Sequence, residues 1–138
     1  MTDTLTRAER SERMSRVRAR DTKPEMAIRK LVFSLGYRYR LHDRKLPGTP
    51  DLVFASRRKA IFVHGCFWHR HTGCPNTRWP KSKLRFWVPK LTENRARDIK
   101  KLRKLRRQGW NVLVIWECEV KRAAGLSSRI TGFLEGRR

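Results

Sequence analysis

Residues 110–116 of this 138-residue chain read WNVLVIW and are almost entirely apolar. Such a run predicts a central strand buried on both faces, with Trp110 and Trp116 in the core. A strand of this kind needs neighbouring strands and a layer of helices on each side. The rest of the chain offers both, in the order helix, three strands, helix, this strand and a last helix. We therefore expect an α/β fold with one mixed β-sheet flanked by helices.

The first helix is predicted between Thr22 and Gly36. Thr22 is a good N-cap, and Pro24 lies where its missing N–H costs nothing. Glu25 stands three residues after the cap, as in a capping box, and Gly36 is expected to end the helix. The apolar residues of this segment recur with the spacing of one helical face, namely Ile28, Leu31, Val32 and Leu35.

The later elements follow from alternation and from proline-rich or glycine-rich breaks. Tyr37, Tyr39 and Leu41 alternate with polar residues, which predicts a strand with one wet face over residues 37–42. We then expect strands at 52–55 and 60–63, an irregular stretch over 64–90, a helix over about 90–108 and a last helix around 126–134. The helix at 90–108 should line its apolar side with Leu91, Ile99, Leu102 and Leu105.

The charge of the chain narrows the class of partner. There are 35 Lys and Arg residues against 12 Asp and Glu, a formal net charge of +23. A field of this strength attracts polyanions, so nucleic acid is the default partner, although another basic protein, such as a ribosome-associated one, fits the charge equally well. No segment is apolar enough to span a membrane, and the first residues lack a signal-peptide core. We therefore expect a cytoplasmic protein, associated with the nucleoid when bound to DNA.

Residues 1–20 carry several arginines, Arg16, Arg18 and Arg20 among them, and few apolar side chains. Their spacing could make one basic helical face, or the segment could be an arm that becomes ordered on DNA. We expect an arm at 1–20 and a single domain at 21–138, since the length suits one domain.

Three cysteines and a histidine form a metal-binding pattern. Cys66, His71 and Cys74 read C-x4-H-x2-C, and Cys118 lies far along the chain. Thiolates and imidazoles hold zinc in closed four-ligand sites, which would explain how residues 64–90 keep a shape without their own core. Buried free cysteines are the alternative, and the nearby histidines leave open which imidazole binds.

Acidic residues are scarce in this basic chain, so each needs an explanation. Asp51 follows a loop with two prolines and opens a strand, where its carboxylate would suit Mg²⁺. A turn or capping role is the alternative, and for Asp51 taken alone the better one. Glu25 already has the capping box as an explanation, but a role in a site is compatible with it.

His64 and His69 directly follow the strand predicted at 60–63. Histidine can act as a general acid or base near neutral pH. That strand should pair with the one that Asp51 opens, so the two histidines and the aspartate could converge if His71 binds zinc. A packed or spare histidine is the alternative for either position.

Aromatic residues alternate with cations between residues 67 and 87. Such a surface stacks on bases or wedges between base steps. Burial in a core is the usual alternative for aromatics. Phe67 and Trp68 are expected in a turn beside the candidate site, so at least one of them should be exposed.

Four segments together resemble the very short patch repair (Vsr) family of DNA mismatch endonucleases. They are residues 47–51 (PGTPD), 61–69 (IFVHGCFWH), 86–87 (FW) and 114–118 (VIWEC). The resemblance extends over about residues 10–120, and HGCFWH with the distant WEC is highly specific.

The resemblance implies a fold like that of restriction endonucleases of the PD-(D/E)XK superfamily, with a structural zinc ion. It implies Mg²⁺-dependent nicking of duplex DNA 5′ to the T of a T:G mismatch, the product of 5-methylcytosine deamination, which starts very short patch repair. The implied partners are mismatched double-stranded DNA and, functionally, a cytosine-5 DNA methyltransferase. A monomer is expected.

Matched position by position, Asp51 corresponds to the family's Mg²⁺-binding aspartate and Val63 to a main-chain carbonyl ligand. Glu25 and His64 match active-site residues, and His69 matches the general acid or base. The zinc ligands match Cys66, His71, Cys74 and Cys118; the DNA-contacting residues match Phe67, Trp68, Trp87 and the clamping arm with Arg16, Arg18 and Arg20.

Three positions depart from the family or superfamily pattern. The spacing from His71 to Cys74 is one residue longer than in the family, which could bend the zinc loop. Val63 replaces a threonine, which a main-chain ligand tolerates. Phe62 and His64 stand where the superfamily has an acid and a lysine.

Other functions remain open from the sequence. A sequence-specific nickase or restriction-type nuclease would use the same site on matched DNA. A non-catalytic, zinc-stabilised DNA-binding module would bind without cutting. A basic RNA-binding protein would have no use for Asp51 beside two histidines, so the repair endonuclease is the preferred interpretation.

Overall fold

The computed structural model describes residues 21–136. The expected basic arm at 1–20, with Arg16, Arg18 and Arg20, lies outside the described residues, as do the last two residues. Within the described part, no helix is both long and apolar enough to cross a membrane.

The centre of the fold is a four-stranded mixed sheet, as the sequence predicted. Its strands are β1 (Arg40–Leu41), β2 (Leu52–Phe54), β3 (Lys59–His64) and β4 (Asn111–Trp116), in the spatial order β1-β2-β3-β4. The pairs β1–β2 and β2–β3 are antiparallel, and β3–β4 is parallel. The parallel pair requires a long crossover, which the chain between β3 and β4 provides.

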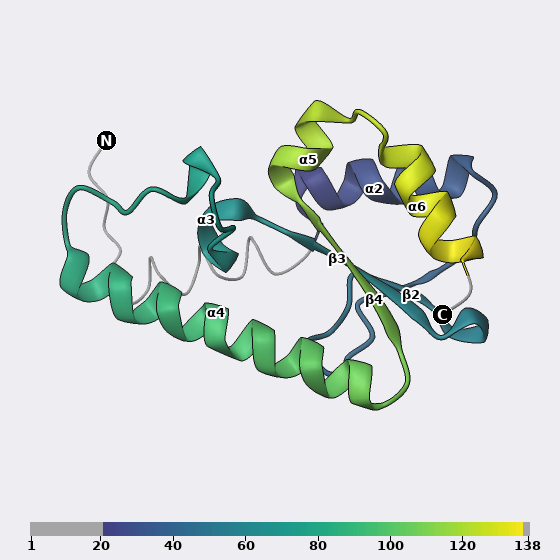
Figure 1. Ribbon diagram of the computed structural model, residues 1–138, viewed down its shortest axis with the longest axis horizontal. Helices are drawn as coiled ribbons and strands as arrows, with labels where there is room; N and C mark the ends of the chain where they lie inside the picture. Colours follow the sequence, from purple (N-terminus) through teal and green to yellow (C-terminus); the bar gives the residue numbers. More distant parts are fainter. Residues whose placement is uncertain (1–20, 137–138) are drawn as a thin grey trace.

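Helices cover both faces of the sheet (Figure 1). On one side lie α2 (Lys23–Ser34), α5 (Glu117–Arg122) and α6 (Leu126–Glu135), and on the other lies the long α4 (Leu84–Arg107). A single-turn helix, α3 (Cys66–His69), directly follows β3. Short 3₁₀ turns occupy Ala55–Arg57 and Pro75–Thr77.

The core consists of two hydrophobic layers separated by β3. Ile61 belongs to the larger layer, which packs α2 and α6 against the sheet and includes Ile28 and Ile130. Its neighbour Phe62 points to the other side and packs with Leu105 of α4. This alternation buries β3 on both faces, as expected of a strand between two helical layers.

The prediction that residues 110–116 form the central strand is wrong. Within the described residues β4 pairs only with β3 and lies at the edge of the sheet. Ile115 is its one fully buried residue, whereas Trp116 is half-buried and the half-buried Trp110 lies before the strand. The side chains of β4 are apolar because helices pack on both faces of the sheet. An apolar strand can therefore lie at the edge of the sheet as well as at its centre.

The helix expected from about residue 90 begins at Leu84 and contains Pro89. The prediction placed the start too late because aromatic and cationic residues in the first turns of this helix interrupt the regular spacing of apolar residues. Leu91 and Leu105 are buried, but Ile99 is 43% exposed, against the prediction. At about 100° per residue, Ile99 lies about 80° around the helix from Leu91, which turns it away from the sheet.

The first helix agrees with its sequence signals, and the strand after it is shorter than expected. The backbone N–H of Glu25 donates to Oγ1 of Thr22 at 3.3 Å, which is half of a capping box. Of the strand predicted at 37–42, only β1 forms, and Leu41 is 42% exposed because β1 is an edge strand of two residues. The helix α5 was not predicted.

Candidate active site and metal centre

Asp51 directly precedes β2, at the end of the loop that contains Gly48. This loop lies tightly against β3, because a side chain added at Gly48 would come within 3.1 Å of the ring of Phe62. Asp51 is only 8% exposed, and its Oδ2 accepts a hydrogen bond of 2.7 Å from the backbone N–H of Val63. The antiparallel pairing of β2 and β3 thus holds one carboxylate oxygen in place.

Glu25 of α2 is a second buried carboxylate beside Asp51, with 1% exposure. Burial is the main reason that the pKa of Asp51 rises to about 8; the Val63 N–H opposes this rise, and the charge and hydrogen bond of Glu25 add to it. Two neighbouring buried carboxylates are costly unless a cation compensates them. Their oxygen donors, with Val63 lining the same cavity, fit a hard divalent ion such as Mg²⁺.

His64 and His69 lie face to face beside the two carboxylates. Their ring centroids are 3.9 Å apart and their planes differ by 9°. Burial, and secondarily the neighbouring His69, holds the pKa of His64 well below its usual value. Nδ1 of His69 contacts Oδ2 of Asp98 in α4, so the other ring nitrogen, Nε2, remains for contact with a substrate.

One cavity of about 140 Å³ collects these groups. Its lining includes Glu25, Asp51, Val63, His64 and His69, which come from α2, the loop before β2, β3 and α3. The structure therefore brings together all five residues that the sequence placed at the catalytic site. Such a space has room for a phosphate group together with water molecules.

Sequence reasoning missed two residues that line the same cavity, Asp98 and Lys101 of α4. The scarcity of acidic residues could have pointed to Asp98, which stands in a strongly basic helix. It also missed His42, which follows β1 and contacts Glu25, with Nε2 2.8 Å from Oε2.

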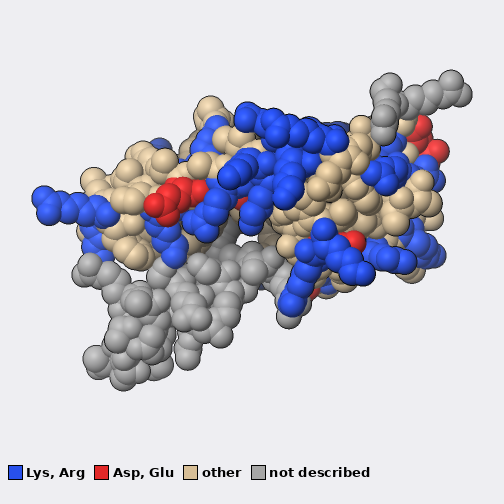
Figure 2. All heavy atoms as spheres, turned by 90° about the horizontal axis from the view of Figure 1, so that it is seen from below, with Lys and Arg blue, Asp and Glu red and all other residues tan. Residues whose placement is uncertain are grey.

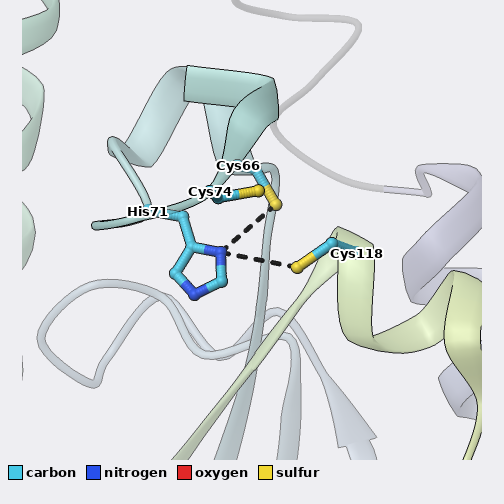
Figure 3. A group of neighbouring side chains, drawn as sticks. All are labelled: Cys66, His71, Cys74 and Cys118. Atoms are coloured by element: carbon cyan, nitrogen blue, oxygen red, sulfur yellow. Dashed lines mark hydrogen bonds between the residues drawn. The ribbon is translucent and has the colours of Figure 1, made fainter. Parts of the chain in front are cut away.

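The four predicted zinc ligands come together between the segment around α3 and the start of α5 (Figure 3). Nδ1 of His71 lies 3.6 Å from Sγ of Cys66 and 3.5 Å from Sγ of Cys118. One donor atom each from Cys66, His71, Cys74 and Cys118 lies within 4.8 Å of the others. Cys118 belongs to α5, so the cluster joins the loop after β3 to the helix after β4.

The donors of this cluster suit zinc. Burial raises the pKa of the Cys66 thiol to about 12, and the adjoining cysteines contribute to the rise. A thiol with so high a pKa keeps its proton unless a metal cation replaces it. Three sulfurs and one imidazole nitrogen make the closed Cys₃His set typical of structural zinc. The ring of His71 also stacks on Trp116, with centroids 4.2 Å apart, which fixes its orientation.

Aromatic residues of α3 and of the first turn of α4 form a contiguous cluster. Phe67 lies edge-on to Trp68 and Trp87, with centroids 5.4 and 5.9 Å away. Phe67 and Trp68 belong to α3 instead of the expected turn. Trp68 is buried, whereas Phe67 and Trp87 are half-buried and Trp79 is 45% exposed. The cluster therefore has an inner member that supports the others and outer members that remain accessible.

Lys and Arg side chains gather on the face that carries α4 (Figure 2). The helix has basic residues along its whole length: Arg85, Lys90, Arg95, Arg97, Lys100, Lys101, Arg103, Lys104, Arg106 and Arg107. This basic helix runs past the cavity, since Lys101 lines it. A phosphate backbone placed along α4 would meet the cavity.

Comparison with known proteins agrees with this geometry. The family model described as DNA mismatch endonuclease Vsr matches residues 2–75. The type II nicking enzyme V.XorIIP of Xanthomonas oryzae pv. oryzae is 50% identical over 135 residues, which cover 98% of each chain. The DNA mismatch endonuclease Vsr of Escherichia coli K12 is 38% identical over 121 residues, 88% of this chain and 77% of the relative.

Among solved structures, the catalytic domain of the homing endonuclease I-Bth0305I has the same fold, with a TM-score of 0.56 and 18% identity. The match covers 82% of this chain and 94% of that domain. At this level of sequence identity it is evidence for the fold alone. The family match, the coverage of the relatives and the nuclease fold agree. The chain belongs to the Vsr family of DNA mismatch endonucleases.

Proposed function

We propose that this protein nicks duplex DNA 5′ to the T of a T:G mismatch in a Mg²⁺-dependent reaction and so starts very short patch repair. The observation that carries the proposal is the convergence of Asp51, Glu25, His64 and His69 on one small cavity beside a basic helix. On this proposal the enzyme works as a monomer on DNA in the cytoplasm. Its mismatches arise where a cytosine-5 DNA methyltransferase has acted and the methylated base has lost its amino group.

Asp51 and the main-chain carbonyl of Val63 would hold Mg²⁺, with Glu25 beside them. When bound, Mg²⁺ would polarise the scissile phosphate and stabilise the leaving 3′-oxygen. His69, oriented by its contact with Asp98, would accept the proton of the attacking water through Nε2. His64, whose lowered pKa keeps it neutral, would contact the phosphate as an uncharged donor. The products would be a 5′-phosphate and a 3′-hydroxyl.

The remaining groups would bind and select the DNA. Zinc on the Cys₃His cluster would fix α3 relative to α5 and thereby fix His69 in the cavity. Phe67 and Trp87 would wedge into the duplex beside the mismatch, where opening a mispaired step costs less than opening a matched one. The expected arm with Arg16, Arg18 and Arg20 would clamp the backbone.

A second candidate function is a nick in matched DNA at a specific sequence. It is favoured by several relatives that are named type II nicking enzymes, including those of Xanthomonas oryzae and Neisseria meningitidis. The two functions share the chemistry and differ in the substrate, so a comparison of substrates separates them.

The test is a strand-labelled nicking assay on a T:G duplex and its C:G parent, in Mg²⁺ and in EDTA, across several flanking sequences. It includes the wild type, Asp51→Ala and the control Glu93→Ala, which removes an exposed carboxylate on α4. Cutting 5′ to the mismatched T, lost in EDTA and in Asp51→Ala but kept in Glu93→Ala, supports the proposal. Equal cutting of both duplexes favours the sequence-specific nickase, and tight binding without any cut favours a binding module.

A further inference from the structure

His42 lies directly across the sheet from Asp51. The β1–β2 register pairs Leu41 with Leu52, and the backbone N–H of His42 donates to the carbonyl of Asp51 at 3.2 Å. The strand then ends, and His42 takes a left-handed backbone conformation with φ +47°. This conformation is uncommon for a residue other than glycine, so the chain is turned here under the constraint of its surroundings.

The side chain of His42 reaches both carboxylates of the candidate metal site. Its Nε2 lies 2.8 Å from Oε2 of Glu25 and 4.0 Å from Oδ1 of Asp51. The side chain is 14% exposed and that of Glu25 is 2% exposed, so water competes little for the contact. A carboxylate can only accept, so the imidazole donates its Nε2–H.

Glu25 is held by two further donors. Its Oε1 accepts from the backbone N–H of Asp21 at 3.0 Å, and its Oε2 also contacts the guanidinium of Arg29. The Arg29 guanidinium carries one positive charge between Glu25 and Asp21. His42 also approaches Asp51, at the oxygen that does not accept from the Val63 N–H, and the charge of Arg29 acts on Asp51 as well.

We propose that His42 is a positioning residue that orients Glu25 beside Asp51, so that both carboxylates face one divalent cation in the cavity. The inference deepens the proposed function and rests on it for the identity of the site. On this inference His42 acts through Glu25 and is not itself a ligand of the ion. It belongs to the shell that orients the ligands, and loss of such a partner typically weakens metal binding about 10–100-fold.

Two substitutions of His42 distinguish the effect of the side chain's reach to Glu25 from the effect of the backbone conformation at residue 42. In His42→Gln the amide nitrogen lies as many bonds from the backbone as Nε2 of histidine and can donate to Glu25. In His42→Asn the amide is one bond shorter and cannot reach, while asparagine tolerates the left-handed backbone well. Asparagine therefore preserves the turn and removes the contact, and glutamine preserves the contact.

The first readout is calorimetric titration of the full-length protein with Mn²⁺, without DNA. We expect His42→Asn to weaken Mn²⁺ binding about tenfold and His42→Gln to bind within about twofold of wild type. The second readout is the Mg²⁺ concentration that gives half-maximal nicking of saturating DNA, which should shift by the same factors. Melting temperature and DNA affinity, measured alongside, should stay close to wild type in both variants.

Wild-type Mn²⁺ affinity in His42→Asn would overturn the inference, and so would equal weakening in both variants together with an equal drop in melting temperature. The latter pattern would mean that His42 has only a structural role, in which its contact with Glu25 stabilises the packing of β1 against α2. A wild-type protein that binds Mn²⁺ but nicks no T:G duplex would refute the proposed function, while the Mn²⁺ titration would still decide the role of His42. A wild type that binds no Mn²⁺ would overturn the inference as well.

Discussion

His69 stacks on His64 with a centroid distance of 3.9 Å, and its Nδ1 contacts the carboxylate of Asp98. Two protonated rings in this geometry would repel each other, and burial already opposes a charge on His64. The carboxylate of Asp98 contacts Nδ1 of His69, and one of its oxygens also lies within 4.8 Å of a ring nitrogen of His64. The pair therefore combines a buried imidazole that stays neutral with a second imidazole whose Nδ1 contacts a carboxylate.

Asp98→Asn should lower the nicking rate without weakening DNA binding. The amide no longer stabilises a protonated His69 or fixes its ring, so part of the roughly 10²–10⁴-fold contribution of a general acid–base group is lost. Single-turnover nicking of a T:G duplex at saturating enzyme measures the rate, and a gel-shift titration measures the affinity. Glu93→Ala on the same helix is the matched control. A rate equal to wild type would mean that Asp98 has no part in orienting His69.

Asp51→Asn should abolish nicking, by at least about 10³-fold if the carboxylate holds a catalytic ion. It should leave the free energy of unfolding without Mg²⁺ unchanged or higher, because asparagine removes the cost of burying the Asp51 carboxyl, whose pKa is raised to about 8 in the fold. Urea denaturation with and without Mg²⁺ measures both effects: Mg²⁺ should stabilise the wild type and not the variant. Residual nicking near the wild-type rate would exclude Asp51 as a ligand of the catalytic ion.

Cys118→Ser should release zinc and lower the melting temperature. The site is built from two segments far apart in the sequence, so losing one ligand frees α5 from the loop after β3. Elemental analysis of purified protein should fall from about one zinc per chain, and the melting temperature should drop by about 5 °C or more. An unchanged melting temperature, or wild-type protein without zinc, would show that the cysteines are only buried thiols.

Phe67→Ala and Trp68→Ala should have different effects. Phe67 is half-buried, and its removal should reduce the preference for T:G over C:G about tenfold, within the range of base–aromatic stacking. Trp68 is 8% exposed, so Trp68→Ala should cost about 3–5 kcal/mol of stability. Competition binding with both duplexes and urea denaturation test the pair. Identical stability of the two variants would contradict the burial difference.

Lys59→Met should destabilise the C-terminal helix without changing the site. The buried ammonium of Lys59 donates to the carbonyls of Phe133, Leu134 and Gly136, at 2.6, 3.0 and 2.6 Å. Leaving these acceptors at the end of α6 without a donor should cost about 3 kcal/mol. Arg57→Met, which removes a more exposed contact to the same helix end, should cost under about 1 kcal/mol. Similar losses in both variants, measured by urea denaturation, would argue against this role for Lys59.

Local patterns predicted most of the secondary structure. Thr22 and Pro24 mark the start of α2, and the two strands of the β2–β3 hairpin form within one residue of their expected positions. The helix α4 was placed too late because its first turns read as aromatic and cationic residues around Pro89. These turns are nevertheless helical, because they continue the helix that follows and because Phe86 and Trp87 pack beside α3.

The sequence by itself determined the chemistry of this protein: a strongly basic chain, a Cys₃His pattern, and Asp51, His64 and His69 at spacings that resemble one endonuclease family. These features depend on residue types and short separations, which a single sequence displays. Only the tertiary structure decided that β4 lies at the edge of the sheet while β2 and β3 are internal, that Asp98 lies beside His69, and that His42 contacts Glu25 next to Asp51. The contacts of His42 with Glu25 and of His69 with Asp98 join residues 17 and 29 positions apart, through sheet order and helix packing. Burial of each element depends on all of its neighbours at once, so no local pattern encodes it.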